Sequence, residues 1–230
     1  MRMEWIRRNI LTLFWVILFI HCLFHFLHLP FVGISKLLLL PSLLVYLFTR
    51  RKEEALAGIN FFYLVAIVFA FIGDMLLVII NDLLFLPGMI SYIVNLFFLC
   101  IFFLQLHKIH LHQLLRPLLV LLVLAVIGYF VYGFLGDKLK QFQLPVLVYM
   151  CFVAITAALA MNTTQHPQLH RTGWLFFIGI LVFIVSNTIL VLNRFHFLYH
   201  NLYIAVMLTY GTAQYLLARG VALVSKDVQS

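Results

Sequence analysis

Residues 56–80 have the sequence LAGINFFYLVAIVFAFIGDMLLVII, a mostly apolar stretch with a single carboxylate, Asp74, in its second half. A run of about 20 apolar residues is long enough to cross a bilayer as a helix. Similar runs occupy residues 9–28, 31–49, 84–106, 116–135, 142–161, 173–193 and 198–218. The pattern predicts an all-α integral membrane bundle of eight transmembrane helices, in which residues 1–230 form a single domain.

The composition supports the same fold class. The 230 residues are 65% apolar and only 10% charged, whereas an ordinary soluble domain is roughly half apolar and about a quarter charged. A soluble globular protein is therefore excluded. Eight spans leave about 70 positions for the termini and loops, which excludes a large extramembrane domain or a nucleic-acid-binding module. Any chemistry must lie among the helices, and we expect no cofactor.

Basic residues distinguish the two sides of the predicted bundle. With eight spans both termini lie on one side, here called side A, and the opposite side is side B. Cationic loops stay in the cytoplasm, and 11 of the 15 Lys and Arg residues fall on side A, against three on side B and one inside a helix. Both termini are therefore predicted to be cytoplasmic. The side-A residues are Arg2, Arg7, Arg8, Arg50, Arg51, Lys52, Lys108, Arg116, Arg171, Arg219 and Lys226; Lys138, Lys140 and Arg194 lie on side B, and Lys36 lies inside a helix.

Asp74 is the only acid clearly inside a predicted span. A carboxylate within a bilayer costs several kcal/mol unless it is paired, hydrated or protonated, and such acids commonly mark a proton or substrate site. At about 1.5 Å per residue, Asp74 and Asn187 lie roughly 9 Å from the side-B ends of their helices, and Lys36 lies roughly 7 Å inside its own. This shared depth predicts a polar pocket that opens toward side B.

Other embedded polar residues are further candidates, each with a structural alternative. Tyr149 and Tyr203 belong either to the pocket or to the aromatic belt at the membrane interface. Asn95 and Ser186 either line the pocket or join helices by hydrogen bonds. Lys36 is either a pocket residue or a side chain that reaches the side-B surface. The alternative for Asp74 is a purely structural ion pair with Lys36.

Histidines in the first predicted helix follow a helical spacing. His21, His25 and His28 stand at i, i+4 and i+7, which places imidazoles on one face as metal ligands require. No embedded carboxylate on that helix completes a metal site. We therefore predict no metal, and we interpret the three histidines as a polar stripe near the membrane interface.

Three motifs follow one another along the chain: FIGDMLL at residues 71–77, a stretch at residues 177–195 that contains Ser186-Asn187 and Arg194-Phe195, and TYGTAQYL at residues 209–216. Together they resemble the YhhN family of eight-span membrane proteins, which includes the lysoplasmalogenases. Residues 71–77, FIGDMLL, are similar to the Gly-Asp motif of that family. Residues 177–195 are similar to its seventh-span pattern, in which a Ser-Asp pair precedes an Arg-Phe. Residues 209–216, TYGTAQYL, resemble its closing Tyr-x-x-Ala-Gln-Tyr-Leu signature. The order and spacing of these motifs carry the resemblance from about Lys36 to Leu217.

The resemblance implies hydrolysis of the vinyl ether bond of lysoplasmalogen to a fatty aldehyde and a glycerophospho compound. A protonated carboxyl group can protonate the β-carbon of an enol ether, and its conjugate base can stabilise the resulting oxocarbenium ion. Asp74 suits both tasks. The implied partner is a lipid from the bilayer, and the compact loops favour a bacterial inner membrane. The candidate substrate-binding residues are Lys36 and Arg194 for the phosphate, with Asn95, Tyr149, Ser186, Tyr203, Tyr210 and Gln214.

The chain departs from the family at Asn187, where the family carries a second aspartate. An amide neither donates a catalytic proton nor acts as a general base. One hypothesis is a hydrolase of reduced rate, in which Asp74 is the acid and base and Asn187 orients water. The alternative is a noncatalytic lipid-binding or lipid-transporting protein on the same scaffold. A proton-coupled carrier with Asp74 as relay ranks last, because the embedded titratable groups lie in one half of the membrane.

Overall fold

The computed structural model describes residues 2–51, 59–78 and 82–229, with side chains described at residues 9–49, 61–78 and 83–224. The described chain is all-helical, without a strand, which confirms the predicted all-α class. A helix lies over each predicted apolar run. The helices are α1 (Arg2–Phe26), α2 (Val32–Arg51), α3 (Ile59–Val78), α4 (Asp82–Leu106), α5 (Leu115–Leu135), α6 (Gln143–Thr163), α7 (His170–Leu192) and α8 (Leu202–Gln229).

Three short helical turns complete the described chain. Leu111–Gln113 (η1) and Gly136–Phe142 (η2) are 3-10 turns, and Asn193–Phe197 (η3) is a π turn. The π turn ends at Leu198, whose φ of 59° lies in the left-handed region. Asn193 supports this end, since its side chain accepts a hydrogen bond from the Tyr199 N–H and donates one to the Tyr199 carbonyl. For this reason α8 begins at Leu202 and not at the predicted residue 198.

Six stretches of the described helices are long and apolar enough to cross a membrane. One of them, Leu115–Thr163, contains both α5 and α6. The helix α8 is not among them, because residues such as Thr209, Thr212 and Gln214 interrupt its apolar sequence. The apolar helices indicate a multi-pass membrane protein, and the number of eight crossings stays a prediction.

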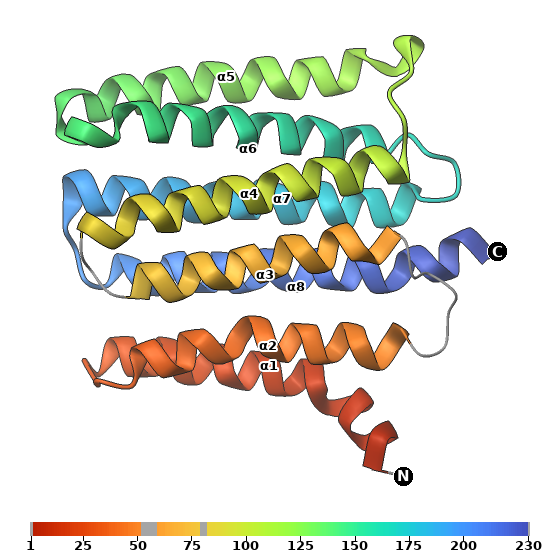
Figure 1. Cartoon of the computed structure of the whole chain (residues 1–230), viewed down its shortest axis with the longest axis horizontal. Coiled ribbons are helices and arrows are strands. Elements are labelled where there is room, and N and C mark those ends of the chain that lie inside the picture. The colour runs from red at the N-terminus through yellow and green to blue at the C-terminus, as the bar shows by residue number, and fades with distance from the viewer. Residues whose placement is uncertain (1, 52–58, 79–81, 230) are drawn as a thin grey trace.

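The predicted charge asymmetry depends largely on residues that lie outside the described side chains. The start of α1 and the end of α8 lie at the same end of the bundle (Figure 1), as an even number of antiparallel helices requires. The assignment of that end to the cytoplasm stays a prediction. The cations concerned are Arg2, Arg7, Arg8, Arg50, Arg51, Lys52 and Lys226.

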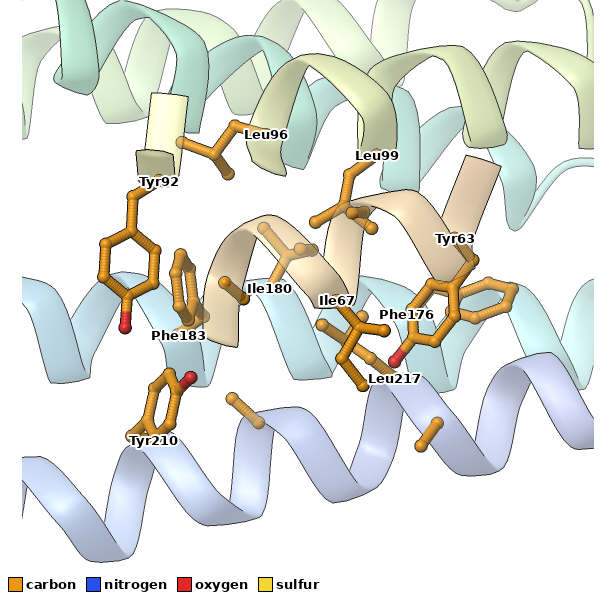
Figure 2. Packing of buried hydrophobic residues seen from close by; sticks show 14 of the residues in the cluster. Tyr63, Ile67, Tyr92, Leu96, Leu99, Phe176, Ile180, Phe183, Tyr210 and Leu217 are labelled. Atoms are coloured by element: carbon orange, nitrogen blue, oxygen red, sulfur yellow. The ribbon is translucent and has the colours of Figure 1, made fainter. Parts of the chain in front are cut away.

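The helices run side by side as a layered bundle, with the pairs α1–α2 and α5–α6 at its two edges and α3, α4, α7 and α8 between them (Figure 1). Aliphatic and aromatic side chains fill the space between these four central helices (Figure 2). Ile67 of α3, Leu99 of α4 and Phe176 of α7 are all nearly inaccessible to solvent. This packed region extends toward the end of the bundle that holds the termini. The polar groups around Asp74 lie closer to the opposite end.

The turn between α6 and α7 requires glycine at residue 173. A Cβ atom there would lie 2.7 Å from the backbone N and Cα atoms of Thr164. Backbone atoms cannot move aside as the tip of a flexible side chain can. We therefore expect Gly173→Ala to lower the free energy of unfolding by about 1–3 kcal/mol, measured as a lower melting temperature by circular dichroism in detergent.

Gly133 of α5 is the matched control, because nothing lies within 4 Å of a Cβ built on it. Gly133→Ala should be neutral or stabilise α5 by up to about 1 kcal/mol, the difference in helix propensity. Equal melting temperatures for the two variants would contradict the close approach at Gly173.

Candidate functional site

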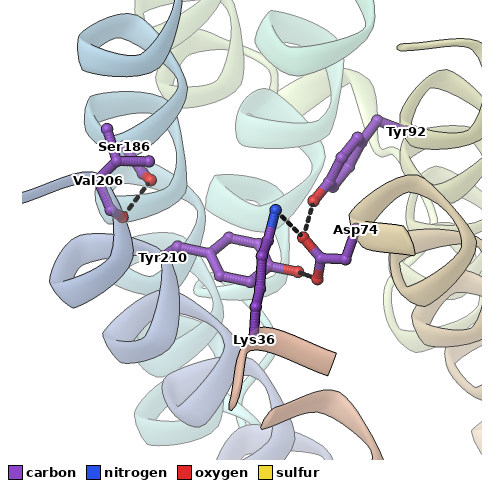
Figure 3. Close-up of polar contacts among 6 residues, drawn as sticks. All are labelled: Lys36, Asp74, Tyr92, Ser186, Val206 and Tyr210. Carbon is purple, nitrogen blue, oxygen red and sulfur yellow. Dashed lines mark hydrogen bonds and ion pairs between the residues drawn. The ribbon is translucent and has the colours of Figure 1, made fainter. Parts of the chain in front are cut away.

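The Asp74 carboxylate is held by groups from three other helices (Figure 3). The Tyr92 hydroxyl of α4 donates to Oδ1 at 2.7 Å, and the Tyr210 hydroxyl of α8 donates to Oδ2 at 2.6 Å. The Lys36 ammonium of α2 lies 3.1 Å from Oδ1. We call these four residues the Asp74 cluster. Asp74 itself is 1% exposed, so the structure replaces water around this acid with protein donors.

Local sequence explains how α3 brings Asp74 close to α4. Gly73 precedes the acid, and a Cβ on Gly73 would lie 2.8 Å from the ring carbons of Tyr92. The absence of a side chain there lets the Tyr92 ring lie against α3, from where its hydroxyl reaches the neighbouring carboxylate. The glycine of the Gly-Asp motif therefore has a packing role in placing Tyr92.

Groups of the protein compensate for the loss of water around Asp74. Burial removes the hydration that stabilises a carboxylate, and an opposite charge with two hydroxyl donors compensates for that loss. The Lys36 side chain keeps 17% of its surface exposed, against 2% for that of Asp74. The acid is therefore the more deeply buried partner. It depends more on the ion pair for stabilisation than Lys36 does, because Lys36 keeps some contact with solvent.

The Asp74 cluster forms part of a cavity of about 440 Å³, here called the chamber, which is lined by both polar and apolar residues. The chamber lies beside the ends of α1, α3 and α7 and the starts of α2, α4 and α8, at the end of the bundle opposite the termini. Its volume falls within the usual range for small-molecule sites. Further polar residues that line it are His21, His25, Ser186, Asn187, Arg194, His200 and Tyr203.

A second, apolar cavity of about 100 Å³ adjoins the chamber. It lies between α4, α5, α6 and α7, and it shares part of its wall with the chamber. Tyr149 lines this apolar cavity, and its buried hydroxyl has no hydrogen-bond partner among the described residues. The residues common to both cavities are Leu77, Phe85, Tyr92, Asn187 and Leu190.

The structure brings most of the predicted site residues together and places others elsewhere. Lys36, Asp74, Ser186, Asn187, Arg194, Tyr203 and Tyr210 all line the chamber. Tyr149 lies in the apolar cavity, as described above. Asn95 and Gln214 line a third, much smaller cavity beside Phe183, so a contact between these two residues and a ligand in the chamber stays a prediction.

Some of the polar residues bind neighbouring backbone. Ser186 of α7 donates to the Val206 carbonyl of α8 at 2.8 Å, and Asn95 of α4 donates to the Ala66 carbonyl of α3 at 2.6 Å. Both bonds join helices. The Asn187 amide nitrogen donates to the Phe183 carbonyl of its own helix at 2.7 Å. That bond leaves the Asn187 side-chain oxygen as the acceptor near the shared wall of the cavities.

Arg194 reaches the chamber from the π turn after α7. Its guanidinium carbon lies 4.1 Å from the centroid of the Phe85 ring, a cation–π arrangement that supports the flat guanidinium. Tyr203, at the start of α8, stacks on His25 with ring centroids 5.7 Å apart. We call the part of the chamber lined by His25, Arg194, His200 and Tyr203 its mouth, because these side chains keep exposed surface. The mouth therefore combines a cation with aromatic rings.

Sequence reasoning missed four polar residues of the chamber, one of which is the buried His21 of α1. Tyr92 supplies one hydroxyl of the Asp74 cluster, and it is the only tyrosine in the predicted helix 84–106, which was an available signal. His25 lines the chamber, and so does His200, which lies 175 residues further along the chain. No local pattern connects the two. Within the described residues no group of three His, Cys, Asp or Glu side chains is arranged to hold a metal ion.

Comparison with known proteins places the chain in a family. The model of the YhhN family matches residues 32–221, most of the chain. No curated protein and no solved structure matches the chain. The matched range includes the Asp74 cluster, Asn187 and Arg194, and it begins after the histidines of α1.

The Lys36–Asp74 pair should behave as a coupled unit in stability measurements. Removing one partner of a buried pair leaves an uncompensated charge and costs about 3–5 kcal/mol, whereas removing both costs much less. We expect Lys36→Met to lower the melting temperature strongly, and the double variant Lys36→Met with Asp74→Asn to recover much of the loss. Lys108→Met, at an exposed position, is the control. Additive effects of the two substitutions would contradict the coupling.

Proposed function

The chain belongs to the YhhN family, and from this premise we propose that it is a membrane-embedded hydrolase that cleaves the vinyl ether bond of lysoplasmalogen-type lipids. The products are a fatty aldehyde and a glycerophospho compound. Asp74 acts as the acid and base of the reaction. The observation that carries the proposal is a buried, hydrogen-bonded carboxylate in a chamber that shares a wall with an apolar cavity.

The two cavities match the two ends of a lysolipid in polarity. A molecule with one hydrocarbon chain and one polar head satisfies both if the part of the chain next to the glycerol lies in the apolar cavity and the head lies in the chamber. The bond between chain and glycerol then lies at the shared wall, beside Tyr92 and Asn187. Tyr92 in turn holds Asp74. The geometry thus supports a reaction at the junction of chain and head.

The proposed reaction begins with protonation of carbon. The protonated Asp74 carboxyl group transfers its proton to the β-carbon of the vinyl ether, and the α-carbon and oxygen share the resulting positive charge. The Asp74 carboxylate stabilises this oxocarbenium ion. Water adds to the α-carbon and returns one proton to Asp74. The hemiacetal then collapses: its hydroxyl proton moves to the ether oxygen, the carbon–oxygen bond breaks, and aldehyde and alcohol leave.

The two tyrosines can hold Asp74 in both protonation states. A phenolic hydroxyl is a donor and an acceptor, so Tyr92 and Tyr210 donate to the carboxylate and can accept from the protonated acid. Lys36 pairs with the same carboxylate. With three hydrogens, its ammonium group can bind a phosphate of the substrate at the same time.

Asn187 has a narrower role than the aspartate of the family. Its side-chain oxygen accepts a hydrogen bond and can orient the attacking water, but it cannot remove a proton. Asp74 must therefore act both as acid and as base, and we propose a correspondingly lower rate.

We also propose eight membrane crossings with both termini in the cytoplasm, in a bacterial inner membrane. The helix α8 counts as a crossing in this proposal, because it packs along α7 within the same layer of the bundle. Its polar residues include Tyr210, which faces Asp74 inside the protein (Figure 3). Polar groups in a span are tolerated where they face protein or a hydrated cavity.

A second candidate function is noncatalytic lipid binding or transport on the same scaffold. Asn187 favours it, since the second acid is missing. The ion pair between Lys36 and Asp74 also favours it, because the pair gives the buried acid a structural role that needs no catalysis. Binding of lysolipid without release of aldehyde would support this candidate over the hydrolase.

Replacement of Asp74 separates the two candidates. Asp74→Asn should reduce aldehyde release from an alkenyl lysolipid by between about 100-fold and 10,000-fold, the usual contribution of a general acid–base group. Binding of a saturated alkyl lysolipid should persist. Asp137→Asn, at an exposed acid in η2, is the control and should keep full activity. Undiminished turnover in Asp74→Asn would overturn the proposed role of this residue.

Restoring the second acid should raise the rate. We expect Asn187→Asp to increase aldehyde release by about tenfold or more, because a carboxylate at the shared wall can take the proton of the attacking water. The kinetics of the purified variant in lipid nanodiscs check this expectation. If the wild type binds lysolipid and neither protein releases aldehyde, the noncatalytic candidate is favoured.

A further inference from the structure

Three histidines, His25, His28 and His200, meet at the mouth of the chamber, and we call them the histidine cluster. His25 Nδ1 lies 3.2 Å from His200 Nε2, and the same His200 nitrogen lies 3.1 Å from the His25 carbonyl oxygen. The ring centroids of His28 and His200 are 4.3 Å apart. The α1 histidines thus contact the α7–α8 connection, and they do so beside a cavity.

The hydrogen bonds define which nitrogens carry hydrogen in the neutral rings. A carbonyl oxygen only accepts, so His200 Nε2 must be the donor to the His25 carbonyl. His25 Nδ1, which faces the same N–H, is then an acceptor. A neutral His25 therefore carries its hydrogen on Nε2, and this N–H remains a donor for a group other than His200.

The first turn of α2 lines the chamber next to these histidines. Val32 and Gly33 belong to it, and no acidic residue occupies this turn. The first N–H groups of an α-helix have no acceptor within the helix, and they form an anion-binding site at its positive end. The Lys36 ammonium follows one turn later, and with three hydrogens it can bind Asp74 and a second acceptor together.

Charge in the chamber also favours an anion. Among the described residues that line it, Asp74 is the one acid, and its oxygens are already bound within the Asp74 cluster. Lys36 pairs with that acid, and the Arg194 guanidinium, which lies over the Phe85 ring, lines the same cavity. The guanidinium of Arg194 suits a planar pair of phosphate oxygens.

We propose that the mouth of the chamber is a phosphate site, in which His25 and His200 act with the first turn of α2, Lys36 and Arg194. The inference rests on the proposed function in one respect: the phosphate is that of a lysolipid headgroup whose chain lies in the apolar cavity. Free phosphate has the same binding chemistry. The histidine pair is the new element, because it joins α1 to the α7–α8 connection around the bound anion.

The test compares two lipids that the protein cannot hydrolyse. A 1-alkyl lysophosphatidylcholine has the phosphate, and a 1-alkylglycerol of the same chain length lacks it; neither contains a vinyl ether. The affinity of the protein for both is measured in nanodiscs of neutral lipid. The wild type should bind the phospholipid at least about tenfold more tightly, as hydrogen bonds to a charged group imply.

The histidine variants then show whether the pair causes this preference. His25→Phe keeps ring packing but loses the Nε2–H donor, and His200→Phe loses the N–H that holds the His25 ring in place. Each substitution should reduce the preference several-fold while leaving alkylglycerol affinity unchanged. His200→Gln keeps a side-chain donor and should restore part of the preference. His112→Phe, exposed in η1, is the matched control and should behave as the wild type.

Competition distinguishes the two sources of phosphate. Displacement of the lysolipid by glycerol 3-phosphate, but not by equal inorganic phosphate, supports a headgroup site; equal displacement by both supports a site for free phosphate. An unchanged preference in both phenylalanine variants, or equal weakening of both lipids, would overturn the proposal. Because the measurement is of binding, it keeps its meaning even if the protein releases no aldehyde.

Discussion

The burial of one carboxylate inside an apolar bundle is the constraint on which the arrangement of the other helices depends. Asp74 lies where water cannot hydrate it fully, so its charge requires Lys36, Tyr92 and Tyr210. These partners come from α2, α4 and α8. The need to satisfy a single acid therefore brings together helices that apolar packing alone would allow to slide or rotate relative to one another.

The same requirement explains why the bundle differs between its two ends. Toward the termini, interlocked aromatic and aliphatic side chains such as Phe102 and Phe176 exclude space for a ligand. Toward the opposite end, the donors to Asp74 and the connections between helices leave the chamber open. The residues of the chamber and the residues of the apolar core thus lie at different depths along the helices. Gly73 links them, because the close approach that packs α3 against Tyr92 also positions a donor to the acid.

The apolar runs predicted the helices well, because a span must be long and apolar whatever its neighbours are. Depth along the helices also placed Lys36, Asp74 and Asn187 at one level, where the structure has a cavity. Depth along a helix does not define which side of the helix a residue faces. Sequence reasoning therefore grouped Asn95 with the residues of the chamber, although Asn95 lines a different and smaller cavity. The contact between His25 and His200 depends on tertiary packing alone, and no spacing along the chain encodes it.

The partners of Asp74 are far apart along the chain, and this has a consequence for synthesis of the protein. Lys36 and Tyr92 flank the acid in sequence, but Tyr210 follows 136 residues after it. Helices that leave the ribosome in order will assemble the carboxylate with only part of its shell until the last one has inserted. A chain that stops before α8 therefore carries a carboxylate that lacks one of its two hydroxyl donors, and its burial in the membrane is less favourable than in the complete bundle.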